Sequence, residues 1–333
     1  MEKTAGPIPV FVFFGPTASG KTDILFRLFT DGNIPVSAEI VSADSMQVYR
    51  GMDIGTAKPG AAERELLPHH LIDIRNPNEQ FNAGDFVRLA DEACAGIWRR
   101  GKLPVVSGGT GFYLKNFIQG LSEAPPSDHK IRAELKTLLQ EKGAAALMEE
   151  LAAGDPVSAA RIHINDEYRL LRALEVLRLT GKPLSSYAVS ASQSRNQGQS
   201  QNSGQERNRY RFLIIGVERP REELYRRING RCAAMFREGL PNEVKALYQA
   251  GYGPEDPGLK AIGYREFFVD DPLDGIRISV DLKGVEALVA QNSRHYAKRQ
   301  VTFFASIPGV KWIDASNGDP LEEIRRDVEV FLH

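Results

Sequence analysis

The chain contains 333 residues, of which 42% are hydrophobic and 26% are charged, and its formal net charge is −1. These proportions are typical of a globular protein with one large α/β domain or two modest ones. No apolar run approaches the length of a membrane span, and residues 1–10 lack the features of a signal peptide, so we expect a cytosolic protein without a membrane partner. The small net charge neither favours nor excludes a nucleic-acid partner.

A glycine-rich loop follows the first predicted strand, Val10 to Phe14. It matches the pattern G-x-x-x-x-G-K-[ST] and consists of Gly15, Pro16, Thr17, Ala18, Ser19, Gly20, Lys21 and Thr22. Its glycines let backbone N–H groups point inward, and the helix predicted next adds a positive N-terminal end. Lys21 is placed to reach terminal phosphate oxygens, and the Thr22 hydroxyl to bind Mg²⁺. This phosphate-binding loop, residues 15–22, therefore predicts a site for a diphosphate or triphosphate.

A second strand is predicted at residues 36–41, and Asp44 follows it closely. Ligands bind beyond the carboxyl ends of parallel strands, so Asp44 is expected to face the ligand of the phosphate-binding loop. Its carboxylate would bind Mg²⁺ through water or take a proton from a nucleophile, unless it only forms a turn. Residues 49–59 then predict a long functional loop.

A third strand is predicted at residues 103–106, after a helix over residues 83–100, and leads into Ser107 to Gly111. An ATP-hydrolysing protein with this kind of loop usually has an acidic residue at the end of such a strand. Ser107 and Gly108 occupy this position instead. This disfavours an ATP-hydrolysing motor or switch protein and favours close approach of a ligand to the backbone. Thr110 is a candidate helix N-cap, a candidate ligand contact, or both.

Pro125 and Pro126 mark a change to helical sequence. Helices are predicted from Ser127 or Asp128 to residue 139, over residues 143–152, and from about residue 166 to residue 180. We interpret residues 125–189 as an all-helical insertion domain and residues 190–208, rich in Ser, Gln and Asn, as a flexible loop without chemistry. Residues 1–124 and 209–333 would then form the α/β core.

The remaining chain returns to strand and helix patterns. Residues 210–217 predict a strand that rejoins the parallel sheet, and residues 259–264 and 282–303 predict two helices. Arg221 and Arg227 begin the helix after the strand and are candidate anion clamps, although a solvated helix face is equally compatible. The predicted fold class is α/β, a P-loop NTPase-like parallel sheet flanked by helices, with an all-helical insertion domain.

Eight segments together resemble the tRNA dimethylallyltransferases, also called tRNA isopentenyltransferases, and they extend over nearly the whole chain. These are residues 15–22, 43–49, 51–59, 69–73, 108–111, 169–175, 261–264 and 296–300. The resemblance implies transfer of a dimethylallyl group from dimethylallyl diphosphate to the exocyclic amine of the adenosine 3′-adjacent to the anticodon, in tRNAs reading codons that begin with U. The products would be isopentenyladenosine and diphosphate. The phosphate-binding loop would hold the prenyl diphosphate rather than ATP for hydrolysis.

The resemblance also implies roles for individual residues. Asp44 would be the general base, and Thr110 would position the reacting centre. Mg²⁺, Lys21, Thr22, Arg221 and Arg227 would stabilise the departing diphosphate. Contacts with the tRNA anticodon stem-loop are implied for Asp44, Ser45, Met46, Gln47, Thr110, Arg132, Arg169, Leu170, Leu171, Arg172 and Ala173.

The chain departs from the family's pattern in two places. An aromatic Trp followed by Arg is common after the segment matching residues 296–300, whereas Val301 to Ala305 stand here. The stretch of residues 190–208 is also longer than expected.

Three alternatives stay open at this point. A P-loop kinase of small molecules or nucleotides would use the same loop for ATP. A free-adenylate isopentenyltransferase would prenylate adenine nucleotides, and a nucleotide-dependent RNA-binding switch would transfer no group. We expect a monomer, because no exposed coiled-coil or apolar repeat indicates a partner chain.

Overall fold

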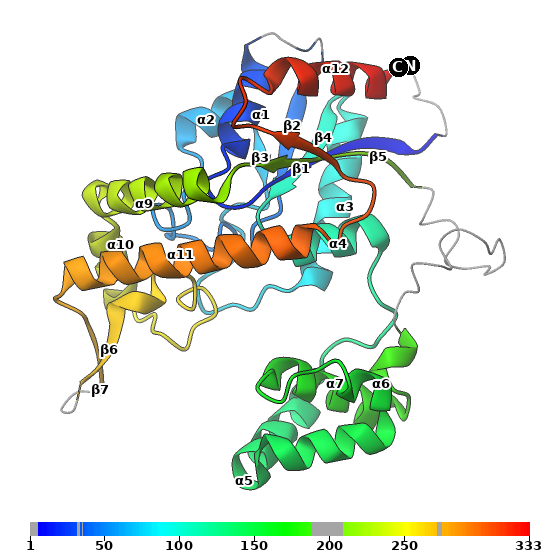
Figure 1. The fold of residues 1–333 in the computed structure, drawn as a ribbon, viewed down its shortest axis with the longest axis vertical. Helices are drawn as coiled ribbons and strands as arrows, with labels where there is room; N and C mark the ends of the chain where they lie inside the picture. Colours follow the sequence, from blue (N-terminus) through cyan, green and yellow to red (C-terminus); the bar gives the residue numbers. More distant parts are fainter. Residues whose placement is uncertain (1–5, 32–33, 35, 188–208, 272–274) are drawn as a thin grey trace. The chain divides into compact units, whose positions relative to one another are not determined.

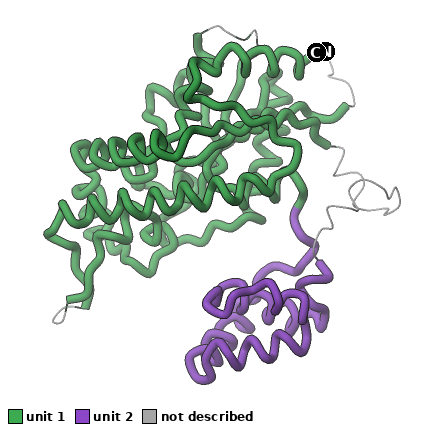
Figure 2. The backbone as a smooth tube through the Cα atoms, viewed as in Figure 1, with its two compact units in different colours: residues 1–120, 205–333 green, residues 121–204 purple. Residues whose placement is uncertain are grey.

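The structure is a computed structural model that describes residues 6–31, 34, 36–187, 209–271 and 275–333. The chain forms two compact units (Figure 2): unit 1 comprises residues 1–120 and 205–333, and unit 2 comprises residues 121–204. The loop predicted at residues 190–208 lies outside the described residues. Within the described ranges, no helix combines the length and the apolar character needed to cross a membrane.

Unit 1 is built on a six-stranded parallel sheet with the order β3-β2-β4-β1-β5-β8 (Figure 1). The strands are β1 (Ile8–Phe14), β2 (Ala38–Ser42), β3 (His69–His70), β4 (Leu103–Gly108), β5 (Tyr210–Glu218) and β8 (Lys311–Asp314). Phe14 pairs with Gly108 on one side and Gly216 on the other, and Ser42 pairs with Ser107. The carboxyl ends of β1, β2 and β4 are therefore level, so the loops that follow them begin side by side.

The two faces of the sheet bury alternate residues of β1, as the period of a strand requires. Val10, Val12 and Phe14 belong to one hydrophobic core, and Phe11 and Phe13 to another. The first core is covered by α3 (Ala83–Arg99), α4 (Gly111–Gln119), α9 (Arg221–Glu238) and α11 (Leu282–Phe304). The second is covered by α1 (Lys21–Thr30) and α12 (Leu321–Leu332). These five side chains of β1 are fully buried, and the burial of each contributes about 1.5–3 kcal/mol to the stability of the fold. The strand before the phosphate-binding loop is therefore firmly anchored.

Shorter elements complete unit 1. They are α2 (Ala61–Leu66), α10 (Leu240–Gln249), the 3₁₀ helix η2 (Arg265–Phe267), and the antiparallel pair β6 (Phe268–Asp271) and β7 (Gly275–Ile278). The prediction of a helix at residues 259–264 was wrong, because these residues form turns. Gly263 has φ 98°, outside the helical region, and its N–H donates to the buried carboxylate of Glu266 at 2.8 Å.

Unit 2 contains α5 (His129–Gly154), α6 (Pro156–Ala159), α7 (Glu167–Thr180) and the 3₁₀ helix η1 (Leu184–Tyr187). The carboxylates of Asp128 and Asp166 accept backbone N–H groups and cap α5 and α7. Gly143 interrupts α5 with φ 76°, which confirms the predicted break between two helices. Unit 2 has a hydrophobic core of its own.

Candidate active site

The phosphate-binding loop connects β1 to α1 and needs its glycines for steric reasons. Gly20 has φ 94°, which only glycine adopts readily. A Cβ atom on Gly15 would lie 2.8 Å from the carbonyl oxygen of Val217 and 2.7 Å from Ser19 Oγ. The loop thus curls tightly between the carboxyl end of β1 and the first turn of α1, where backbone N–H groups favour anions.

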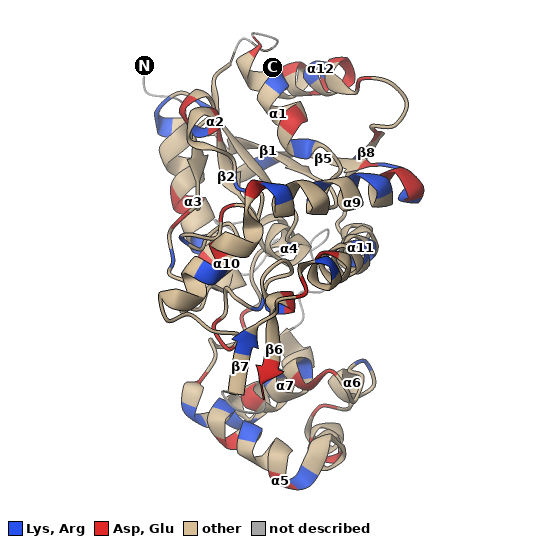
Figure 3. Ribbon diagram, turned by 90° about the vertical axis from the view of Figure 1, so that its left-hand side faces the viewer, with Lys and Arg blue, Asp and Glu red and all other residues tan. Residues whose placement is uncertain are grey.

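Three arginines from the end of β5 and from α9 hold this loop. Arg219 Nε donates to the carbonyl oxygen of Ser19 at 2.7 Å, and Arg227 Nε to that of Ala18 at 2.7 Å. Arg231 Nη1 donates to Thr17 Oγ1 at 3.3 Å. Arginines recur along α9 (Figure 3). The arginines fix successive residues of the loop and bring positive charge to the place where α1 begins.

The structure does not bring Arg221 to this cluster. Arg221 is exposed, and its guanidinium lies 5.0 Å from the centre of the Tyr225 ring. Sequence reasoning missed Arg219 and Arg231, which contact the loop. Both lie with Arg227 in the arginine-rich stretch of residues 207–237, but nothing local in the sequence says which arginines of that stretch point inward.

Asp44 lies in the loop after β2. Its Oδ1 accepts the N–H groups of Met46 at 2.9 Å and Gln47 at 3.3 Å, and no hydrogen bond from a described residue reaches Oδ2. Thr110 does not cap α4 with its side chain; its Oγ1 accepts the N–H of Ser45 at 3.0 Å. The Asp44 carboxylate is therefore oriented through one oxygen, which leaves the other available for a proton.

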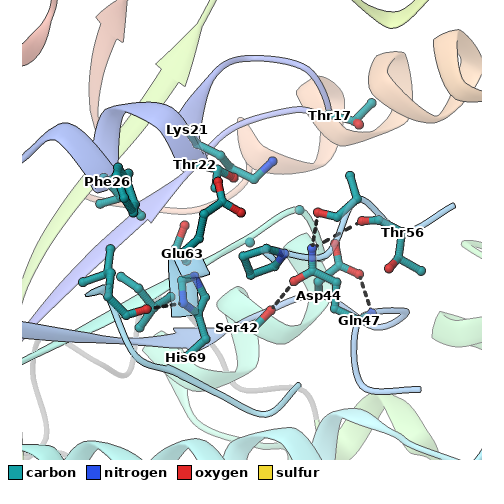
Figure 4. A pocket seen from close by; sticks show the side chains of 18 of the residues that line it. Thr17, Lys21, Thr22, Phe26, Ser42, Asp44, Gln47, Thr56, Glu63 and His69 are labelled. Atoms are coloured by element: carbon teal, nitrogen blue, oxygen red, sulfur yellow. Dashed lines mark hydrogen bonds between the residues drawn. The ribbon is translucent and has the colours of Figure 1, made fainter. Parts of the chain in front are cut away.

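One pocket joins the phosphate-binding loop to Asp44 (Figure 4). Its polar lining includes residues from both loops and from α9 and α11: Thr17, Lys21, Thr22, Asp44, Gln47, Thr56, Arg231, Tyr296 and Gln300. Figure 4 shows Lys21 pointing into the pocket, with Asp44 and Gln47 on one side and Phe26 and His69 toward the other. A second, wider cleft shares Lys21, Thr22 and Arg231 with this pocket and also reaches Arg227.

The electrostatics of the pocket favour an anionic ligand. The pKa of Lys21 is lowered to about 8, mainly by burial and also by the positive charge of Arg231, while Asp44 acts in the opposite direction. Burial also lowers the pKa of Arg231, again opposed by Asp44. Neither cation forms an ion pair with a carboxylate of the described residues. Two desolvated cations without an ionic partner form a site that an anion would stabilise.

The residues present fit a magnesium ion held mainly by phosphate. Within the described residues, no group of three or more His, Cys, Asp or Glu side chains forms a metal site. Thr22 is exposed at the start of α1 and lines both cavities, as does Glu63. Mg²⁺ usually keeps several waters and binds through substrate phosphates with one or two protein ligands, which matches a hydroxyl beside a phosphate site.

The long loop predicted at residues 49–59 is held in place by Glu243 of α10. Its carboxylate accepts the N–H groups of Asp53, Ile54 and Gly55 at 2.8–3.2 Å and the hydroxyl of Tyr264 at 2.6 Å. This clamp places Thr56, whose backbone carbonyl accepts a hydrogen bond from Gln47, at the pocket wall.

The predicted RNA contacts of unit 2 divide into exposed and buried groups. The side chains of Leu170, Leu171 and Ala173 are buried in the core of the unit, so they face the protein interior. Arg172 donates to the buried Glu175 at 3.0 Å and to a backbone carbonyl. Arg169 is 70% exposed. Arg132, also predicted, donates to Ser127 Oγ at 3.0 Å, and its guanidinium lies 4.8 Å from the centre of the exposed Tyr168 ring.

The chain matches known proteins over most of its length. A family model described as IPP transferase matches residues 47–306. The chain is 42% identical to tRNA dimethylallyltransferase 1 of Pelobacter propionicus over 92% of each chain, and 44% identical to the tRNA dimethylallyltransferase of Geobacter sulfurreducens over 93% of each.

Solved structures give the same result. The full-length tRNA isopentenylpyrophosphate transferase of Bacillus halodurans aligns with a TM-score of 0.65 and 38% identity, covering 97% of this chain and 96% of that one. A eukaryotic dimethylallyltransferase acting on tRNA aligns with a TM-score of 0.71 and 26% identity, covering 97% of this chain and 77% of that one. The chain belongs to the IPP transferase family.

Proposed function

We propose that the protein transfers a dimethylallyl group from dimethylallyl diphosphate to the exocyclic amine of an adenosine beside the anticodon of tRNA. The proposal is supported by relatives named tRNA dimethylallyltransferase that match more than nine-tenths of the chain. One structural observation carries the chemistry: Lys21 and Arg231, which form no ion pair with another described residue, line the same pocket as Asp44. One cavity thus contains cations that can stabilise the departing diphosphate and a carboxylate that can accept the proton of the amine.

On the donor side, the phosphate-binding loop, Lys21, Thr22 and Arg227 would bind the diphosphate. The carbon–oxygen bond of the donor breaks with its electron pair on the bridging oxygen, so these groups act on charge that develops in the transition state. Mg²⁺, held by Thr22 and the phosphates, would neutralise part of that charge when bound. A contribution of Arg221 stays a prediction, since its guanidinium lies over Tyr225 here.

On the acceptor side, the exocyclic amine forms the new bond to the first carbon of the dimethylallyl group and loses a proton to Asp44 Oδ2. Thr110 supports this step indirectly, because it holds the N–H of the residue that follows Asp44. An aryl amine is a weak nucleophile, so alignment is expected to provide much of the rate enhancement. The base must also leave the anticodon-loop stack, at a cost of roughly a few kcal/mol.

The proposed partner is RNA rather than a small acceptor. Ser107 and Gly108 end β4, where an ATP-hydrolysing enzyme of this fold usually has an acidic residue. The exposed Arg169 of unit 2 suits a phosphate backbone. We further propose that the enzyme acts as a monomer in the cytosol, and a stable dimer in sedimentation would contradict the first part.

The test is incubation of the protein with an anticodon stem-loop, radiolabelled dimethylallyl diphosphate and Mg²⁺. The proposal predicts label in RNA that contains adenosine 3′ to the anticodon, and none when that base is replaced by a pyrimidine. Parallel reactions offer ATP with small acceptors, or the labelled donor with free AMP. Label in AMP but not in RNA, or consumption of ATP alone, would overturn the proposal.

A further inference from the structure

Gln300 is a buried polar residue near the end of α11, with only 4% of its surface exposed. Its Oε1 accepts the backbone N–H of Thr17 at 2.8 Å, and its Nε2 donates to the carbonyl oxygen of Gly109 at 2.7 Å. The first partner belongs to the phosphate-binding loop and the second to the loop after β4. One side-chain amide therefore joins two loops that lie far apart in sequence.

The two partners specify an amide at this position. A backbone N–H can only donate and a carbonyl can only accept, so the bridging group must have one acceptor and one donor. An ionised glutamate has two acceptors and would direct one oxygen at the Gly109 carbonyl. The fit is close, because a Cβ atom on Gly109 would lie 2.6 Å from Gln300 Nε2.

From Gly109 the contacts continue to the proposed base. Gly109 precedes Thr110, whose Oγ1 accepts the N–H of Ser45 at 3.0 Å, and Ser45 follows Asp44. At the other end, Thr17 also receives the hydrogen bond from Arg231. The path from the loop that would bind the diphosphate to the loop that carries Asp44 thus passes through Gln300.

We propose that Gln300 is a positioning residue that sets the distance and orientation of the leaving diphosphate relative to the Asp44 carboxylate. This inference rests on the proposed prenyl transfer. Gln300 acts through Thr17 and Gly109 rather than on the reacting atoms. Loss of the bridge should therefore lower the rate of the chemical step more than the affinity for either substrate, since small misplacements of reacting groups cost on the order of 10²-fold.

The test compares wild type with Gln300→Glu in single-turnover prenyl transfer over a range of pH. At pH 8 we expect a loss of about 10²-fold in rate, with dissociation constants for diphosphate and for the stem-loop changed less than threefold. Burial raises the pKa of a glutamate, and a protonated carboxyl can donate to the Gly109 carbonyl. The ratio of variant to wild-type rate should therefore rise as the pH falls from about 8 to about 6.

Two further variants make the result specific. Gly109→Ala should lower the rate similarly, because it displaces the amide without changing Gln300. Gln291→Glu makes the same chemical change at an exposed position of α11 and should leave the rate unchanged. A wild-type rate in Gln300→Glu, a deficit that does not change with pH, or normal activity in Gly109→Ala would each overturn the inference. Failure of prenyl transfer in wild type would instead overturn the proposed function.

Discussion

Arg227 donates a hydrogen bond from Nε to the carbonyl oxygen of Ala18 at 2.7 Å, and it also lines the cleft beside the phosphate-binding loop. Its role should therefore combine loop geometry with charge stabilisation. Arg227→Ala is expected to lower the turnover number by about 10²–10³. Arg226→Ala is the matched control, because the neighbouring Arg226 is exposed and lines neither cavity. Equal losses in the two variants, measured by steady-state transfer, would contradict this assignment.

Lys21 should make donor capture dependent on pH. Its pKa is lowered to about 8, so in the free enzyme the ammonium is charged below that pH and neutral above it. The ratio kcat/KM reports groups of the free enzyme, and for the donor it should fall as the pH rises through about 8. Lys21→Arg keeps its charge throughout this range and should abolish the decline, even if its overall rate is lower. The same inflection in both proteins would show that another group titrates.

Glu243 should stabilise the loop of residues 53–55 on which part of the pocket wall depends. Glu243→Gln replaces one of the two carboxylate oxygens that accept the backbone N–H groups of residues 53–55. We therefore expect the free energy of unfolding to fall by about 2 kcal/mol. Tyr264→Phe removes only the hydroxyl bonded to Glu243 and should cost about 1 kcal/mol. Urea denaturation measures both changes. A more stable Glu243→Gln protein would refute the clamp.

Local patterns in the sequence were sufficient to predict much of the fold. The phosphate-binding loop could be predicted because a buried strand, fixed glycine spacing and a helix occur together in one short stretch, and Asp44 because it follows the next strand. The contacts of Gln300 and Arg231 could not be predicted, because each depends on a helix that packs against loops more than 190 residues away in sequence. The turns at residues 259–264 escaped prediction because Tyr264 and Glu266 are held by tertiary hydrogen bonds, with Glu243 and Asn292 respectively.

Substitution of two arginines three positions apart in α7 should affect different properties, RNA binding in one case and stability in the other. Arg169 is exposed, so Arg169→Ala should weaken binding of the stem-loop and reduce the dependence of log K on log salt by about 1, without a loss of stability. Arg172 pairs with the buried Glu175, so Arg172→Ala should destabilise unit 2 by leaving that carboxylate short of a partner. Filter binding across salt concentrations and thermal denaturation separate the two. A lower melting temperature in Arg169→Ala, with unchanged RNA affinity, would contradict this account.

In the proposed reaction, the free oxygen of Asp44 takes the proton of the adenosine amine. Asp44→Asn tests it most directly, because asparagine keeps an oxygen for the N–H groups of Met46 and Gln47 but removes the base. With stem-loop RNA and donor both saturating, we expect a single-turnover rate lower by about 10²–10⁴-fold and near-normal binding of both substrates. Transfer by Asp44→Asn at close to the wild-type rate would contradict it.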